Sequence, residues 1–384
     1  MAKVISMPAK HQKHTKLTKP KGGRFHRNEW TVIGAPCSVL KEFVVSASEK
    51  LQQANITCGY LDMSHNAEDM NEGMDLIMED KLSHWTIKSN KPLLERDFRK
   101  QFLPLDCLFV NGNHYKGDKQ IVFIHPKKKE SLERKLDRLT NVQMIVLCEG
   151  ESSYYDYLKE YVGNEVSVID IAQLDEIAVY ILEQRNENKA PLKGLVLNGG
   201  KSQRMGSAKS HINYHGKPQS EYEADLLKQF CTSTYLSTSQ HSVTEEGSSY
   251  ESIPDTFIGL GPFGGILSAF RKDPNAAWLT VACDLPYLDK ETIAQLVRDR
   301  NTSKVATCFY NPETDFPEPL ITIWEPRAYP ILLDYLAQGY SCPRKVLINT
   351  DIEMIKMADP VKMKNANTPE ERVEAEGYLK TRKR

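Results

Sequence analysis

The chain has 384 residues, of which 40% are hydrophobic and 26% charged, and its formal net charge is −1. This length favours two domains, each able to bury a core of its own. The balanced charge argues against a protein that coats nucleic acid or an anionic membrane. Because no apolar run approaches the ~20 residues of a bilayer span and no secretory signal is visible, we expect a cytoplasmic protein without nucleic-acid or membrane partners.

The eight cysteines form no C-x2-C pair, and their spacing does not suit a zinc site. Most lie inside apolar runs. We therefore expect reduced thiols in the cores of a cytosolic protein.

Residues 1–28 carry eight Lys or Arg and no acidic residue. They lack apolar periodicity, so we expect an irregular basic arm. It is either a solvated tail or an arm that folds over a phosphate-bearing ligand.

Residues 29–183 contain short β-branched apolar runs at 31–34, 56–63, 105–112, 119–126 and 142–150. Helical stretches are predicted at 40–54, 128–139 and 175–183. Strands that alternate with helices predict an α/β domain with a mainly parallel sheet. The polar segment 184–191 is interpreted as a linker, and a second α/β domain is expected over residues 192–384.

The second domain opens with an apolar strand that runs directly into Gly199 and Gly200. Glycines there allow the backbone to approach a ligand, and consecutive N–H groups can form an anion-binding nest. Lys201, Arg204 and Lys209 add positive charge to the same loop. The loop fits neither the Walker pattern nor G-x-G-x-x-G. These features indicate a triphosphate site of another kind.

The string L-x-G-G-x-S-x-R-M-G-x-x-K over residues 197–209 resembles the signature of molybdenum cofactor guanylyltransferases, which belong to the wider nucleotidyltransferase family with a Rossmann-like fold. The resemblance continues in order to about Tyr378. It includes the HGKP turn at 215–218, IPD at 253–255 with GPFGG at 261–265, CDLP at 283–286, PL at 319–320 and NANTPE at 365–370.

The resemblance implies Mg²⁺-dependent transfer of GMP from GTP to molybdopterin with release of pyrophosphate, and molybdoenzyme apoproteins or their chaperones as further partners. The implied catalytic residues are Arg204, Lys209 and Asp284. The implied nucleotide-binding residues are Leu197, Asn198, Gly199, Gly200, Lys201, Ser202, Lys209, Asp255 and Asp284. Asp284 and Asn367 are the implied metal ligands, and Pro319, Arg344 and Lys345 the acceptor-side candidates.

The residues themselves leave alternatives open. Asp284 follows a buried strand, where α/β folds place ligands, but an aspartate there can also cap a helix or make a turn. Asp255 suits an Asx-turn, Asn367 a loop before a helix, and Arg344 a solvated charge. The rival functions are a cytidylyl or sugar-phosphate nucleotidyltransferase, and a non-catalytic molybdenum-cofactor-binding adaptor.

The first domain has a loop between a strand and a helix, GAPCSVLK at 34–41, where a P-loop would lie. Val39, Leu40 and Lys41 occupy the positions of the required glycine, lysine and Ser/Thr, so we expect no NTP hydrolysis. Residues 30–183 resemble the adaptor protein of molybdopterin-guanine dinucleotide biosynthesis, in the segments ITCGYLDMSH at 56–65, DCLFVNG at 106–112 and KQIVFIHP at 119–126. Asn111 stands in place of a glutamate of that family. The resemblance implies two three-layer α/β/α domains, of which the first is P-loop-like with a decayed Walker loop and the second Rossmann-like.

Overall fold

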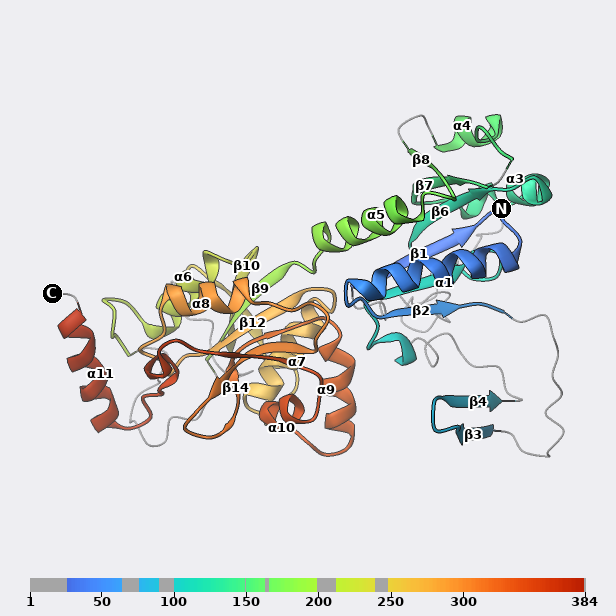
Figure 1. The fold of residues 1–384 in the computed structure, drawn as a ribbon. Coiled ribbons are helices and arrows are strands. Elements are labelled where there is room, and N and C mark those ends of the chain that lie inside the picture. The colour runs from blue at the N-terminus through green and yellow to red at the C-terminus, as the bar shows by residue number, and fades with distance from the viewer. Residues whose placement is uncertain are drawn as a thin grey trace, which may run out of the picture.

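The computed structural model describes residues 26–63, 76–89, 100–148, 150–162, 166–198, 212–238 and 248–382. Figure 1 shows two α/β units, one in blue to green and the other in yellow to red. Helix α5 (Leu174–Glu187) leads from the first towards the second. The fold class expected from the sequence, two α/β domains with parallel sheets, is confirmed.

The first unit is built on a six-stranded sheet in the order β2-β5-β1-β6-β7-β8. All of its neighbouring strands pair in parallel. The strands are β1 (Asn28–Ile33), β2 (Cys58–Leu61), β5 (Cys107–Asn111), β6 (Lys119–Ile124), β7 (Val142–Leu147) and β8 (Ser167–Asp170).

Side chains that alternate along these strands supply a separate core to each face of the sheet. Val32 and Phe123 pack with helix α1 (Cys37–Gln53) and helix α5 on one face. Ile33 and Val122 pack on the other face with Leu132 of α3 (Lys129–Glu133) and Leu158 of α4 (Asp156–Val162). The unit therefore has three layers.

The second unit is built on a seven-stranded sheet in the order β11-β10-β9-β12-β14-β13-β15. Only β14 runs against its neighbours, β12 and β13. The strands are β9 (Leu192–Leu197), β10 (Ser233–Thr238), β11 (Glu251–Pro254), β12 (Ala277–Ala282), β13 (Ala306–Asn311), β14 (Phe316–Trp324) and β15 (Glu353–Lys356).

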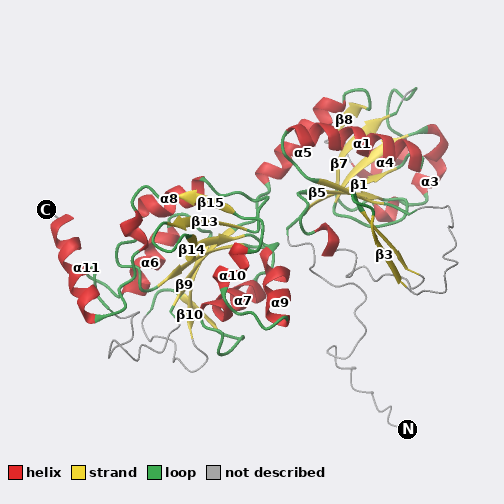
Figure 2. Cartoon of the chain, turned by 60° about the horizontal axis from the view of Figure 1, so that its bottom comes forward, coloured by secondary structure: helices red, strands yellow, loops and turns green. Residues whose placement is uncertain are grey.

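Two cores again enclose the sheet, as Figure 2 shows for the helices in red. Val196 and Leu279 face α6 (Gln219–Lys228) and α8 (Lys290–Arg298). Leu195 and Trp278 face α7 (Pro262–Lys272), α9 (Ala328–Ala337) and α10 (Pro343–Ile348). The last helix is α11 (Pro369–Arg382).

Three expected elements differ from the structure. The stretch 128–139 is not one helix, because α3 ends at Glu133 and only a 3-10 turn follows at Leu136–Arg138. The helix expected to end at residue 183 continues to Glu187, so part of the segment interpreted as linker is helical. A hairpin of β3 (Leu76–Asp80) and β4 (Trp85–Ser89) was not expected at all.

The eight cysteines are free thiols, as the sequence predicts. They are not all core residues, because Cys342 is exposed and Cys37, Cys58 and Cys231 are half-buried. Within the described ranges, no helix combines the length and the apolar character that a bilayer crossing requires.

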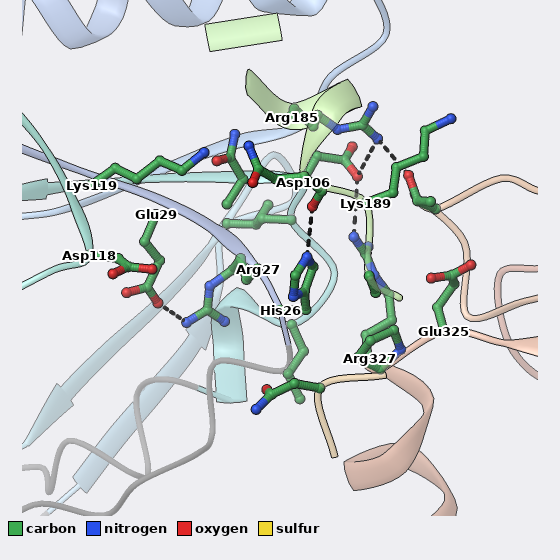
Figure 3. Close-up of a pocket in the computed structure, with 18 residues that line it drawn as sticks. His26, Arg27, Glu29, Asp106, Asp118, Lys119, Arg185, Lys189, Glu325 and Arg327 are labelled. Atoms are coloured by element: carbon green, nitrogen blue, oxygen red, sulfur yellow. Dashed lines mark hydrogen bonds and ion pairs between the residues drawn. The ribbon is translucent and has the colours of Figure 1, made fainter. Parts of the chain in front are cut away.

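A cavity of about 400 Å³ lies between the two units and is lined mostly by charged and polar residues (Figure 3). Beside it the Asp106 carboxylate of the first unit lies 3.2 Å from the guanidinium of Arg327 and 3.5 Å from that of Arg185. Arg185, on α5, also donates to Ser303. None of the residues expected in the nucleotide site lines this cavity, so we interpret it as part of the domain junction.

Candidate nucleotide-binding site

Three of the expected site residues follow neighbouring parallel strands of the second sheet. Asn198 comes directly after β9, Asp255 directly after β11, and Asp284 two residues after β12. The carboxyl ends of β11, β10, β9 and β12 meet at one edge because these strands are adjacent and parallel. Ligands of α/β proteins bind at this edge.

Hydrogen bonds tie these loops together. The Asn198 N–H donates to the Ser237 carbonyl over 3.3 Å, and the Ser237 hydroxyl donates to the Asp255 carboxylate over 2.9 Å. The Cys283 N–H donates to the Leu197 carbonyl over 3.4 Å. The Leu197 side chain is buried in the core, so only its backbone can face a ligand.

The glycine-rich loop that starts at this edge lies outside the described residues. Its expected members are Gly199, Gly200, Lys201, Ser202, Arg204 and Lys209. Their roles therefore stay predictions from the sequence. What the structure contributes is the position from which the loop departs, between the ends of β10 and β12.

The described hydrogen bonds of Asp255 include no Asx-turn, and its carboxylate accepts a hydrogen bond from Ser237 of the neighbouring strand. Partial burial raises the pKa of Asp255, and the Ser237 hydroxyl opposes that rise. The Ser237 hydroxyl thus positions the Asp255 side chain.

The loop after Asp255 leads into α7, and two of its glycines lie within the helix. The helix begins at Pro262, after Gly261 with φ +57°, so Gly264 and Gly265 lie inside the helix and are buried. A Cβ atom on Gly264 would lie 2.3 Å from the Phe257 carbonyl oxygen. The glycine is therefore needed for the close packing of this loop against the helix.

Asp284 is bonded to the loop that contains Asn367. The Asp284 carbonyl accepts a hydrogen bond of 2.9 Å from the Ala366 N–H, which brings the exposed Asn367 into the same region. Thr368 and Glu371 exchange hydrogen bonds that cap α11, and the Asn367 N–H joins them. The carboxylate and the side-chain amide offer oxygen donors, which is the donor chemistry that suits Mg²⁺.

Glu223 of α6 is a buried acid next to this site that the sequence analysis missed. It is fully buried and accepts a hydrogen bond of 2.9 Å from Gln219, which also donates to the Leu285 carbonyl. Burial, and secondarily the charge of Asp284, raise the pKa of Glu223 well above its ordinary value. The signal in the sequence is an acid and an amide four residues apart on the buried face of a helix.

Two of the three acceptor-side candidates lie close together. Pro319 is buried in β14, next to Glu318, whose carboxylate lies 3.6 Å from the Arg344 guanidinium. Arg344 is therefore paired rather than only solvated. Lys345 is exposed, and its ammonium lies over the Tyr340 ring, 5.2 Å from the centroid. The structure does not bring Lys345 to Pro319 through any described contact.

In the first unit, the loop expected at 34–41 is shorter than expected, because β1 ends at Ile33 and α1 begins at Cys37, so residues 37–41 are helical. Gly34 has φ +102°, and a Cβ there would lie 2.2 Å from the Phe123 carbonyl oxygen. Leu40, in the position of the P-loop lysine, is fully buried in the core. It thus packs the domain instead of facing a ligand.

Residues 194–352 match the family described as MobA-like NTP transferase domain. Together with the fold and the strand-end site of the second unit, this match defines a nucleotidyltransferase. The chain is 33% identical over 239 residues to the molybdenum cofactor biosynthesis bifunctional protein of Synechocystis sp., covering 60% of this chain and 67% of that protein. It therefore belongs to the MobA-like family of molybdenum cofactor biosynthesis proteins.

Two further similarities cover one half of the chain each. The molybdenum cofactor guanylyltransferase of Pseudomonas putida is 24% identical over 188 residues, which are 47% of this chain and 95% of that protein. The crystal structure of Bacillus subtilis MobB is 19% identical with a TM-score of 0.32, and the match covers 41% of this chain and 97% of that chain. The enzyme class and the family resemblance expected from the sequence are confirmed.

Proposed function

We propose that the second domain transfers GMP from GTP to molybdopterin and releases pyrophosphate. The observation that carries the proposal is the meeting of Asn198, Asp255 and Asp284 at one edge of the sheet, beside the start of the glycine-rich loop. The names of the relatives supply the substrates, since guanylyltransferases of the molybdenum cofactor are among the proteins that this chain resembles.

In this reaction a terminal phosphate oxygen of the acceptor forms a bond to the α-phosphorus of GTP, and the bond from that phosphorus to the bridging oxygen of pyrophosphate breaks. The attacking phosphate is already anionic, so no general base is required. What the protein must supply is positioned positive charge where charge builds up on the phosphoryl oxygens. Arg204, Lys209 and the N–H groups of the glycine-rich loop are the proposed donors.

The residues present fit a magnesium ion held by Asp284 and Asn367, which would neutralise phosphate charge when bound. On the acceptor side, Arg344 is the proposed phosphate contact, with Glu318 orienting its guanidinium. We propose that the finished dinucleotide passes to a molybdoenzyme apoprotein or its chaperone, and that the first domain hydrolyses no NTP.

The test is a pyrophosphate-release assay on the full chain with each of the four NTPs and Mg²⁺, with and without molybdopterin. We expect release with GTP only, and only when molybdopterin is present. Asp284→Asn should reduce the rate about 10²–10³-fold, the range found when a preorganised electrostatic group is removed. Asp299→Asn, at the C-terminal end of α8, where the half-exposed carboxylate pairs with Arg298, is the matched control and should keep full activity.

The other outcomes distinguish the rivals. Release with CTP, or with GTP and a sugar phosphate, would assign another nucleotidyltransferase. Tight binding of molybdopterin without any pyrophosphate release would assign a non-catalytic adaptor. Unchanged turnover of Asp284→Asn would contradict the role of this aspartate.

A further inference from the structure

Cys37, Asp62 and His114 meet at the carboxyl edge of the first sheet, far in sequence from the nucleotide site. Cys37 is the first residue of α1, Asp62 follows β2 directly, and His114 follows β5. These elements adjoin because the sheet order is β2-β5-β1. One ligand atom from each of the three side chains lies within 4.8 Å of the other two.

The distances within this cluster resemble those between the ligands of one metal ion. The Cys37 sulfur lies 3.4 Å from Nε2 of His114, and Oδ1 of Asp62 lies 3.9 Å from the same nitrogen. In tetrahedral zinc sites, with Zn–S of about 2.3 Å and Zn–N of about 2.0–2.1 Å, neighbouring ligand atoms lie roughly 3.3–3.8 Å apart. The two distances from His114 therefore match this range to within a fraction of an ångström, and the sulfur and the carboxylate oxygen lie within 4.8 Å of each other.

A nucleophilic triad explains the cluster less well. In such a triad the base takes the nucleophile's proton on one ring nitrogen, while the carboxylate holds the other. Here the thiol and the carboxylate both face Nε2 of His114. Two groups that converge on one nitrogen cannot relay a proton through the ring, but they can share a cation with it.

Neighbouring side chains hold the cluster in place. Asn111 donates to Oδ1 of Asp62 over 2.8 Å, and the Tyr60 hydroxyl donates to Oδ2 over 3.0 Å. Asn113 donates to the Ala35 carbonyl over 3.1 Å and lies 3.9 Å from the Cys37 sulfur. Hydrogen bonds of this kind orient the ligands of metal sites. Asn111, which stands where the resembled family has a glutamate, thus orients Asp62.

We propose that Cys37, Asp62 and His114 bind one zinc ion, with a fourth position open to water or another ligand. Mixed sulfur, nitrogen and oxygen donors select a borderline cation rather than Mg²⁺, which requires oxygen. Binding releases the thiol proton, because the thiolate is the ligand. The site occupies the edge where a P-loop domain would hold phosphates. It does not depend on the proposed transferase activity.

The full chain, stripped with a chelator and titrated with Co²⁺, tests the proposal. We expect one Co²⁺ per chain with thiolate-to-cobalt charge-transfer absorption, which Zn²⁺ abolishes by displacement. Cys37→Ser should remove this absorption, and His114→Gln should weaken Zn²⁺ binding at least about tenfold, by comparison with the loss of second-shell groups. Cys342→Ser, which removes an exposed thiol of the other domain, is the matched control and should leave both unchanged.

A second measurement needs no variant. Zn²⁺ should protect Cys37 from alkylation, mapped by mass spectrometry, while Cys342 stays reactive. This readout applies even if Cys37→Ser does not fold, which circular dichroism would reveal. The site would be overturned by a metal-free wild-type chain at saturating Co²⁺, or by charge-transfer absorption that survives in folded Cys37→Ser. Alkylation of Cys37 at the same rate with and without Zn²⁺ would also overturn it.

Discussion

Replacing Asp106 by alanine should weaken the junction between the two domains. Its side chain is only 2% exposed, whereas those of Arg185 and Arg327 are 17% and 14% exposed. Removing one partner of a buried ion pair costs about 3–5 kcal/mol. Both arginines retain some access to water, so we expect the lower end of this range, about 3 kcal/mol, with the contact to Arg327 as the part that crosses the junction. This corresponds to roughly a hundredfold more opening of the junction. Thr57, which also loses an acceptor, adds a cost within the first domain.

Hydrogen exchange followed by mass spectrometry measures this effect for each domain, which matters because a two-domain chain need not unfold in one step. Peptides from β5 and α9 should exchange faster in Asp106→Ala. A double-mutant cycle with Asp106→Asn and Arg327→Met isolates the pair, and we expect a coupling energy of at least about 1 kcal/mol. Arg298→Met, at an exposed site, is the control. A coupling energy below about 0.3 kcal/mol would refute the reasoning, because independent sites are additive within that error.

Three further predictions concern pH and two glycines. Burial alone would raise the pKa of Asp106, but hydrogen bonds from neighbouring groups and an arginine charge lower it, so the stability that the carboxylate contributes is present above pH 3.8 and is lost as the pH falls through the lower folded value. The unfolding free energies of the wild type and Asp106→Asn should therefore converge below pH 4, and a constant difference down to pH 3 would contradict this. Gly34→Ala should lower the free energy of unfolding, measured by urea titration, by about 2–4 kcal/mol, because the new Cβ would clash with the Phe123 carbonyl and the φ of residue 34 is positive. Gly150 has a similar φ but no atom near the position of a Cβ, so Gly150→Ala should cost only about 1 kcal/mol in the same titration. Gly264→Ala should displace the loop that contains Phe257 and weaken GTP binding, measured by calorimetry, about tenfold or more. Unchanged GTP affinity in a folded variant would exclude this loop from the nucleotide site.

The sequence predicted most of the strands because buried parallel strands require compact β-branched runs. β5, β6 and β7 all lie within the expected ranges. The predicted helix over 128–139 is wrong, because α3 ends at Glu133 and the backbone leaves helical geometry at Lys135. After the 3-10 turn, the buried Gln120 side chain donates to the Arg138 carbonyl and accepts the N–H groups of Thr140 and Asn141, which fixes the chain at that point. Hydrogen bonds between segments that are distant along the chain leave no local pattern in the sequence.

The part of the candidate nucleotide site that lies at strand ends or belongs to a family motif could be predicted from the sequence. Asn198, Asp255 and Asp284 each come just after an apolar run, and the topology makes those runs neighbours. Glu223 and the Cys37 cluster were not predicted, since each depends on which helix or loop packs beside a strand end. Cysteine spacing in particular indicates only metal sites whose ligands are close along the chain.

The passage from one sheet to the other is short. Helix α5 ends at Glu187 and β9 begins at Leu192, so only the tetrapeptide Asn188-Lys189-Ala190-Pro191 intervenes. Fully extended, such a peptide reaches about 14 Å. Each domain therefore stays near the other at a local concentration on the order of millimolar, whatever the amount of protein in the cell. Contacts too weak to hold two separate chains together suffice when the partners are covalently tethered this closely.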